Sequence, residues 1–273
     1  MKIIDYSISK EVFSIVYDKE IEGYRTSPTP DNLDFYYQSD DYISHTDANR
    51  TFFEKVYQVV KDQNLKYKKR LVNQYSLNKH SILDYGCGTG DFLLQMQKSN
   101  WNVSGIEPNL KAIKLAKQKG ISILDFEELK KSSSKFNVLT LWHVLEHLPD
   151  LNNKFRLFSD LLDQQGVLII AVPNFKSWDA FHYKKFWAGY DVPRHLWHFS
   201  KKSIKLLAKK HNFELLDTHP MYFDSVYVSI LSEKYKNASF SFLKGALKGI
   251  YSNLHAFFKT NEYSSQIYVL KKK

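Results

Sequence analysis

The chain has 273 residues, 43% of them apolar and 15% aromatic, which suits one large domain with a sizeable core and excludes a wholly disordered protein. Its single cysteine, Cys87, excludes an intramolecular disulfide framework and a cysteine-based zinc site. No window approaches 18 consecutive apolar residues and the N-terminus lacks a signal-peptide pattern, so we expect a soluble protein in the reducing cytoplasm.

The formal net charge of +10 is unevenly distributed along the chain. Residues 201–273 carry 13 lysines and 5 acids, a local balance of +8, whereas the other 200 residues carry only +2. Such a bias accompanies nucleic-acid or anionic-membrane partners, although a solvated lysine-rich face produces the same numbers.

In chain order, residues 1–50 are polar, aromatic and turn-rich, and we interpret them as an N-terminal extension of a main domain at 51–273. Apolar residues at three- and four-residue steps predict a helix over 46–75. Strands are then predicted at 81–85, 102–107, 121–124, 136–142 and 166–172, with helices at 91–98 and 109–119. This alternation indicates an α/β fold with a parallel sheet. Two last strands, 213–218 and 266–270, flank an insert at 219–262 that is helical in pattern.

The strongest local signal is the loop Asp84-Tyr85-Gly86-Cys87-Gly88-Thr89-Gly90 between a strand and a helix. Glycines allow positive φ and close approach of a ligand to the backbone. The spacing differs from that of dinucleotide folds, because Asp91 occupies the third glycine site, and no Gly-Lys-Ser/Thr follows as in a P-loop. Glu107 closes the next strand, where a carboxylate can accept both hydroxyls of a ribose.

At these residues the sequence resembles the class I S-adenosylmethionine-dependent methyltransferases, and within them the bacterial group related to ubiquinone-biosynthesis O-methyltransferases. The resemblance covers about residues 80–200 and is carried by ILDYGCGTGDFL, GIEPN, LTLWHVLEHLPD, GVLIIAVPN and DVPRHLWHFS. It implies a Rossmann-like, seven-stranded, mostly parallel sheet with helices on both faces and an antiparallel last strand. It also implies S-adenosylmethionine as the cofactor and S-adenosylhomocysteine as the product.

The same resemblance assigns cofactor-binding residues by position. The glycine loop would wrap the methionine part, Glu107 would hold the ribose, Asp125 would meet the adenine, and residues after strand 136–142 would flank the cofactor. The implied set is Asp84, Tyr85, Gly86, Cys87, Gly88, Gly90, Glu107, Pro108, Asp125, Phe126, Trp142 and His143, with Tyr42 and His45 as candidates from the preceding segment. Plainer roles stay open for some of them: Asp125 as a helix cap, Phe126 as core, and Tyr42 and His45 as local packing.

His143, Glu146 and His147 form an H-x-x-E-H step just after the predicted strand 136–142. One interpretation is structural capping, and another is a general base that takes a proton from the acceptor. A third is a divalent metal site, since the step resembles the E-x-x-E-H of small-RNA 2′-O-methyltransferases. Because His143 replaces the first glutamate and Mg²⁺ prefers oxygen ligands, no metal ligand is assigned.

Nine aromatics occur in the 25 residues from 175 to 199, beyond the carboxyl end of strand 166–172. We interpret 175–200 as an aromatic lid that encloses an apolar or ring-shaped acceptor, or one that only packs over the cofactor. Arg194 and His195 lie within it, and the candidate catalytic residues are therefore His143, His147, Arg194 and His195.

Large apolar residues recur with helical spacing between 240 and 259, among lysines. This helix packs on the sheet, forms a substrate cap, or contacts an anionic membrane surface. Nucleic acid is the weakest partner, because no RNA- or DNA-binding module is recognisable and the positive charge lies away from the glycine loop.

The sequence therefore favours a cytoplasmic methyltransferase that acts on an oxygen atom of a small or lipophilic acceptor. In-line displacement at an activated methyl group needs no protein nucleophile, so the lack of a triad does not count against an enzyme. The alternatives are an RNA 2′-O-methyltransferase and a catalytically silent protein that binds S-adenosylmethionine. The acceptor, the oligomeric state and membrane contact are not determined by the sequence.

Overall fold

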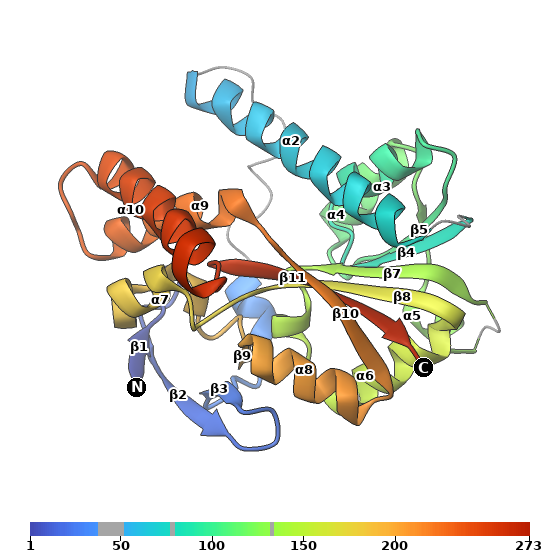
Figure 1. Cartoon of the computed structure of the whole chain (residues 1–273), viewed down its shortest axis with the longest axis horizontal. Coiled ribbons are helices and arrows are strands. Elements are labelled where there is room, and N and C mark those ends of the chain that lie inside the picture. Colours follow the sequence, from blue (N-terminus) through green and yellow to red (C-terminus); the bar gives the residue numbers. More distant parts are fainter. Residues whose placement is uncertain (38–51, 77–79, 132–133) are drawn as a thin grey trace.

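The computed structural model describes residues 1–37, 52–76, 80–131 and 134–273. Its main element is a seven-stranded sheet (Figure 1) in the order β10-β11-β8-β7-β4-β5-β6. The strands are β4 (Ser81–Tyr85), β5 (Asn102–Ile106), β6 (Ser122–Ile123), β7 (Phe136–Trp142), β8 (Leu162–Pro173), β10 (Phe213–Pro220) and β11 (Ser265–Lys272). The ladders from β6 to β8 are parallel, and β11 runs antiparallel to both β8 and β10. The predicted α/β fold and the antiparallel last strand are confirmed.

Consecutive residues of the inner strands point to opposite faces of this sheet, and both faces are apolar. Leu83 and Leu139 belong to one hydrophobic cluster, while their neighbours Ile82 and Val138 belong to the other. All four side chains are completely buried. Near-continuous apolar runs are what a parallel sheet covered on both sides requires, which explains why these short segments become strands rather than helices.

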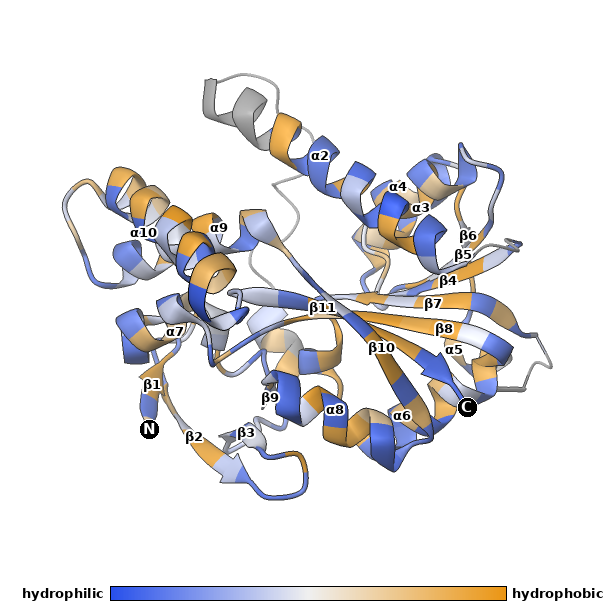
Figure 2. Cartoon of the chain, viewed as in Figure 1, coloured by the Kyte–Doolittle hydropathy of each residue, from blue (hydrophilic) through white to orange (hydrophobic). Residues whose placement is uncertain are grey.

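Helices cover both faces. On one side lie α2 (Phe52–Tyr75), α3 (Asp91–Gln97) and α4 (Leu110–Gln118), and on the other lie α5 (Phe126–Lys131), α6 (Leu151–Leu161) and α8 (Lys201–Lys210). The buried apolar residues of these helices pack in the two clusters, and Figure 2 shows hydrophobic and hydrophilic residues alternating along the helices, as helical periodicity requires. The predicted helix at 46–75 is described from Phe52 onward.

A second, four-stranded sheet has no counterpart among the sequence predictions. Its order is β1-β2-β3-β9, with β1 (Lys2–Ile4), β2 (Val12–Asp18), β3 (Gly23–Ser27) and β9 (Trp197–His198). The described part of the N-terminal extension thus pairs with the end of the 175–200 segment. That segment also holds α7 (Trp178–Tyr183) and two 3₁₀ turns, η3 (Lys184–Phe186) and η4 (Ala188–Tyr190).

Four of the nine aromatics of the predicted lid, Phe175, Tyr183, Trp187 and Tyr190, pack in a cluster with this second sheet, and Phe199 and Trp197 pack with the main sheet. Tyr183, Trp187 and Tyr190 are at most 8% exposed and pack with Phe13 and Ile15 of β2. The lid is therefore a packed layer in which the second sheet supports its rings. Phe181, at 77% exposed, is the exception among its large apolar side chains.

The insert before β11 is a helical hairpin of α9 (Tyr222–Tyr235) and α10 (Ser241–His255), followed by the π-helical turn η5 (Ala256–Thr260). The two helices meet through small residues. A Cβ atom added to Gly245 would lie 2.4 Å from the Cα of Ile230, and one added to Gly249 would lie 2.5 Å from the Cα of Val226. Glycine at both positions lets the backbones approach closely.

From this contact we predict that an alanine substitution in α10 lowers stability, although alanine has the higher helix propensity. By helix propensity alone, Gly249→Ala should stabilise α10 by about 1 kcal/mol. Because the new methyl group meets backbone atoms of α9, we expect it instead to lower the free energy of unfolding by about 1–3 kcal/mol, measured by urea denaturation. Leu247→Ala, on the exposed side of the same helix, is the matched control and should change little. A stabilised Gly249→Ala protein would contradict the packing described.

Candidate functional site

The glycine loop turns the chain sharply from β4 into α3. Gly86, Gly88 and Gly90 have φ values of 80°, 55° and 78°, in the left-handed region that favours glycine. The N–H groups of Gly86 and Cys87 both donate to the carbonyl of Ile106, at 2.7 and 3.0 Å, which fixes the loop on the end of β5.

The loop also lies directly against the segment that follows β7. A Cβ atom on Gly86 would come within 2.5 Å of Val144, which stands between His143 and the 3₁₀ turn η2 (Leu145–His147). The structure therefore places the two strongest sequence motifs, the glycine loop and the H-x-x-E-H step, side by side at the carboxyl ends of β4 and β7. This is the edge where open α/β sheets bind ligands.

Glu107 forms the other wall of the loop. Its carboxylate is 8% exposed and accepts hydrogen bonds from the N–H of Gly88 at 2.9 Å and from that of Asn109 at 3.0 Å. Burial raises the pKa of Glu107, and the two N–H donors oppose that rise. Each carboxylate oxygen has used one of its lone pairs on the backbone and keeps another for a ligand hydroxyl.

Asp84 is buried behind the loop and accepts a hydrogen bond from the Thr140 hydroxyl at 2.6 Å. Burial raises the pKa of Asp84 to about 7, with Thr140 and the Lys68 ammonium opposing the rise. Burial in turn lowers the pKa of Lys68, whose ammonium lies 4.6 Å from the ring centre of Trp142. The indole Nε1 of Trp142 is buried and has no hydrogen-bond partner among the described residues, which leaves a donor for a ligand.

Other residues of the predicted cofactor-binding set make contacts that have structural roles. Tyr85 packs against Phe158 and Phe126 on the far face, so only its backbone belongs to the loop. Asp125 caps α5 by accepting from the N–H of Glu127 at 2.9 Å, and Pro108 is exposed beside Glu107. The Cys87 thiol is buried against Gly105, and burial raises its pKa, so it is no nucleophile. Tyr42 and His45 lie outside the described residues.

His143 is held between two carboxylates. Its Nε2 lies 2.8 Å from Asp224 of α9, and its Nδ1 lies 3.3 Å from Glu146. Burial alone would lower the pKa of the imidazole, but the two carboxylates outweigh it and raise the pKa to about 10. His143 is thus a cation near neutral pH. This arrangement does not favour the predicted role as a general base, because both ring nitrogens already carry protons.

Glu146, His147 and His195 form a compact cluster, called here the η2–lid cluster. One ligand atom from each lies within 4.8 Å of the others, a donor set that suits a divalent transition metal as well as proton transfer. Glu146 is completely buried, and its Oε2 has no partner among the described residues. Burial would raise the pKa of Glu146, but the neighbouring histidines lower it, so the carboxylate is charged.

The two histidines of the cluster are oriented by backbone carbonyls. His195 Nδ1 lies 3.0 Å from the carbonyl of Gly189, which leaves Nε2 facing Asp191 at 3.7 Å and Glu146 at 4.0 Å. His147 Nδ1 lies 3.0 Å from the carbonyl of Arg194 and 2.9 Å from the Tyr37 hydroxyl. Burial, with His195 close by, lowers the pKa of His147 to about 4.

Arg194 and His198 are engaged elsewhere. The guanidinium of Arg194 pairs with Asp191 and donates to the Ser7 hydroxyl at 3.1 Å. His198 lies 3.0 Å from the Thr26 hydroxyl, and burial lowers its pKa to about 3. Both residues join the lid to the N-terminal sheet, so the structure gives no sign that Arg194 faces an acceptor.

Sequence reasoning missed Lys68, Asp224 and Tyr37, which reach the site from α2, α9 and η1 (Leu33–Tyr37). Lys68 and Asp224 lie in no motif, whereas Tyr37 begins the segment that supplied the candidates Tyr42 and His45. Each of the three contacts residues at least 70 positions away in the chain. Asp224 lies near the start of the 219–262 insert, but nothing in the sequence indicates that it contacts His143.

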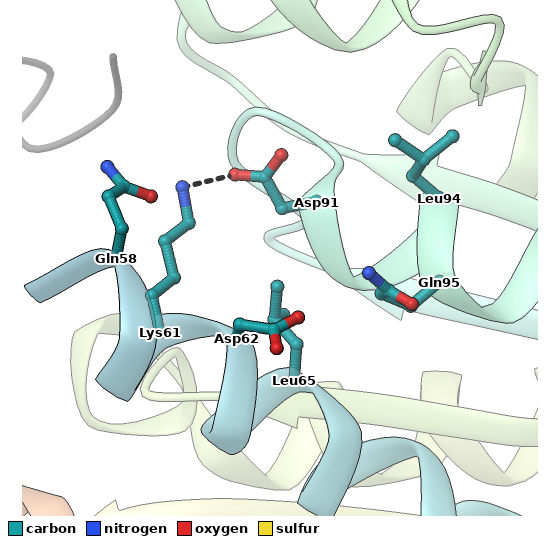
Figure 3. A pocket seen from close by; sticks show the side chains of 7 residues that line it. All are labelled: Gln58, Lys61, Asp62, Leu65, Asp91, Leu94 and Gln95. Carbon is teal, nitrogen blue, oxygen red and sulfur yellow. Dashed lines mark ion pairs between the residues drawn. The ribbon is translucent and has the colours of Figure 1, made fainter. Parts of the chain in front are cut away.

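A hollow between α2 and α3 is distinct from this site. Figure 3 shows it lined by Gln58, Lys61, Asp62, Leu65, Asp91, Leu94 and Gln95. Lys61 lies 2.7 Å from Asp91, which Lys119 also contacts at 2.6 Å. The lining is mostly polar and already ion-paired, which does not suit an apolar ligand.

The chain is similar in sequence to known methyltransferases. Residues 58–218 match the family model of a methyltransferase domain. The ubiquinone biosynthesis O-methyltransferase of Histophilus somni is 30% identical over 118 residues, 37% of this chain and 49% of that protein. That of Pelagibacter ubique is 28% identical over 162 residues, 54% and 67% of the two chains. The chain thus spans about half to two thirds of the length of these curated relatives.

Solved structures agree on the fold. Magnesium protoporphyrin IX methyltransferase from Synechocystis, solved with bound S-adenosylhomocysteine, has a TM-score of 0.54 at 17% identity and covers 87% of this chain and 97% of its own. A sarcosine dimethylglycine methyltransferase from Galdieria sulphuraria, described as putative, has a TM-score of 0.57 at 13% identity, with 80% and 88% covered.

The charged state of His143 predicts a pH dependence of stability. Because its folded pKa of about 10 lies above its ordinary value of 6.5, its stabilising effect is complete below pH 6.5 and is lost as the pH rises toward 10. The difference in unfolding free energy between the wild type and His143→Gln should shrink across that window, measured by urea unfolding at about pH 6, 8 and 9.5. His80→Gln removes an exposed imidazole and should show no such trend. A pH-independent difference for His143→Gln would exclude the charged contact with Asp224.

Proposed function

The chain belongs to the methyltransferase-domain family, and from that premise we propose that it transfers a methyl group from S-adenosylmethionine to an oxygen atom of a small or lipophilic acceptor. The observation that carries the proposal is the direct contact of the glycine loop with Val144. The glycine loop, with Glu107 beside it, thus lies at the same edge of the sheet as the histidine cluster, which supports the proposal.

The residues present fit the cofactor. Glu107 has one lone pair left on each oxygen for the two ribose hydroxyls. No atom lies within 4 Å of a Cβ built on Gly88, so a ligand can approach there. The buried N–H of Trp142 offers a further donor. Bound S-adenosylmethionine supplies a methyl group already activated by its sulfonium.

In this proposal His195 is the general base. The Gly189 carbonyl holds the Nδ1 proton, so Nε2 is free to accept the proton that the acceptor hydroxyl releases as its oxygen is methylated. The new positive charge on the imidazole faces Asp191 and Glu146, which stabilise it. His147 and Arg194 act as positioning residues, and His143 keeps Glu146 in place as a charged partner.

Oxygen as the acceptor atom rests on two supports. The histidine cluster supplies a base, which a hydroxyl acceptor needs, and the curated relatives carry O-methyltransferase names. A lipophilic acceptor is suggested by those relatives, whose names refer to ubiquinone biosynthesis. The Asp125 and Phe126 positions remain proposals for the adenine end, since capping and packing account for their contacts.

Cofactor binding is the first test. Glu107→Ala removes two charge-assisted hydrogen bonds to the ribose, and we expect about a 100-fold loss of affinity for S-adenosylmethionine in titration calorimetry. Glu214→Ala removes an exposed glutamate of β10 and should bind as the wild type does. The absence of saturable binding by folded wild-type protein, or equal binding by Glu107→Ala, would refute the cofactor assignment.

The base is tested by transfer of a labelled methyl group to lipid, quinone-precursor, sugar and RNA fractions. With the accepting fraction, His195→Gln should lose about 10²–10⁴-fold in kcat, while its affinity for S-adenosylmethionine stays unchanged. His80→Gln is the matched control. Full activity in His195→Gln would remove it from the site. Labelling of RNA would favour the RNA enzyme, and no labelling despite tight cofactor binding would favour a silent binding protein.

A metal at the η2–lid cluster is the competing mechanism, because His195 would then be a ligand rather than a base. We expect EDTA treatment followed by desalting to leave methyl transfer unchanged, since His195 Nε2 needs no ion to accept a proton. Loss of activity that Zn²⁺ or Mn²⁺ restores would replace the base by a metal-assisted mechanism.

A further inference from the structure

The helical hairpin α9–α10 with η5 has its large apolar side chains on the outside. Of the 22 large apolar side chains that are exposed in the described part of the chain, 12 lie between 222 and 258. Leu243, Leu247, Ile250 and Leu254 recur along α10 at steps of four, three and four, so they share one face, and each is 50–60% exposed. Figure 2 shows hydrophobic residues along α10.

The inner face of the hairpin is built from small residues instead. Gly245, Gly249 and Ser252 of α10 are buried, as are Ser225, Ser229 and Ser232 of α9. A surface helix in water normally turns its large apolar residues inward. Here the order is reversed: half or more of each of the four outer leucine and isoleucine side chains of α10 is exposed, and burying that remaining surface needs an apolar phase.

The charge on this hairpin is also one-sided. Between 222 and 260 the chain has five lysines and two acids. Both acids point inward, since Asp224 contacts His143 and Glu233 accepts from the buried Tyr183 hydroxyl at 3.1 Å. Four of the lysines are exposed: Lys234, Lys236, Lys244 and Lys259. The outer surface therefore combines apolar side chains with net positive charge.

We infer that the hairpin is a membrane-docking element that lies in the interface of an anionic phospholipid bilayer. An apolar face bordered by lysines is what an interfacial helix presents to acyl chains and anionic headgroups. Among the described residues, no helix combines the length and the apolar character needed to cross a bilayer, which agrees with lying in its surface.

The hairpin is firmly joined to the site. Ser252 of α10 donates to the buried Asp179 of the lid at 2.7 Å, and Asp179 also accepts from Trp187 of the lid at 2.7 Å. At the other end of the hairpin, Asp224 holds His143. The hairpin follows β10 and precedes β11, so it stands at the same edge of the sheet as the glycine loop (Figure 1). Docking would thus bring the site to the lipid surface. This deepens the proposed function, on which it rests, by specifying an acceptor dissolved in the membrane.

Vesicle sedimentation tests the inference and needs no turnover. The wild type should bind vesicles of equal parts phosphatidylcholine and phosphatidylglycerol, bind pure phosphatidylcholine far less, and lose affinity in high salt. A triple variant of the outer face (Leu247→Ser, Leu254→Ser, Phe258→Ser) should not bind the anionic vesicles. A control triple variant at exposed apolar residues elsewhere (Val12→Ser, Val16→Ser, Leu216→Ser) should bind as the wild type does.

Charge is tested separately. A triple variant that removes hairpin lysines (Lys234→Gln, Lys244→Gln, Lys259→Gln) should lose roughly 100-fold in affinity for the anionic vesicles at low salt, about fivefold per lysine. A control triple variant that removes exposed lysines elsewhere (Lys19→Gln, Lys98→Gln, Lys117→Gln) should lose much less. Equal binding by all variants, or none by the wild type, would overturn the inference. So would a wild-type dimer that the triple serine variant dissociates, because the face would then pair with a second copy. Calorimetry with S-adenosylmethionine on the same samples keeps this outcome separate from failure of the proposed function.

Discussion

The buried Glu146 carboxylate is the group on which the arrangement of the site depends. A charged group with no exposed surface is costly unless positive partners surround it. His143 supplies one partner and is itself held by Asp224 of the helical hairpin, while His195 faces Glu146 from the lid. The Glu146 carbonyl also accepts from the N–H of Leu196 at 2.8 Å. Glu146 thus connects the end of β7 to the lid through its backbone carbonyl and its side chain, and to the hairpin through His143.

The cofactor half of the site and most of the main sheet were predictable from sequence, because both depend on local pattern. Apolar runs of four to seven residues marked the inner strands, and the glycines with Glu107 marked the ends of β4 and β5. The motif residues Glu146 and His147 were found for the same reason. Each of these signals lies within a short stretch of chain, where spacing alone determines which side chains meet.

The acceptor half was not predictable in detail, because it is assembled from distant segments. Apolar and polar residues alternate only weakly along the N-terminal strands, and β9 has only two residues. Neither pattern therefore predicts a sheet from the sequence. The pairing of Asp224 with His143 joins positions 81 residues apart. It also disfavours the expected role of His143 as a base, because the two carboxylates raise its pKa, and His195 is the base in the proposed mechanism instead. The sequence favours a ligand wall for the lid aromatics, but four of the nine pack with the second sheet and two pack with the main sheet.

The most direct test of this account is a crystal structure with S-adenosylhomocysteine bound. We predict that both ribose hydroxyls donate to Glu107. The sulfur should point past Trp142 toward the η2–lid cluster, and space for an acceptor should lie between the sulfur and His195. A ribose held away from Glu107, a ligand in the hollow between α2 and α3, or a sulfur directed away from Glu146 would contradict it.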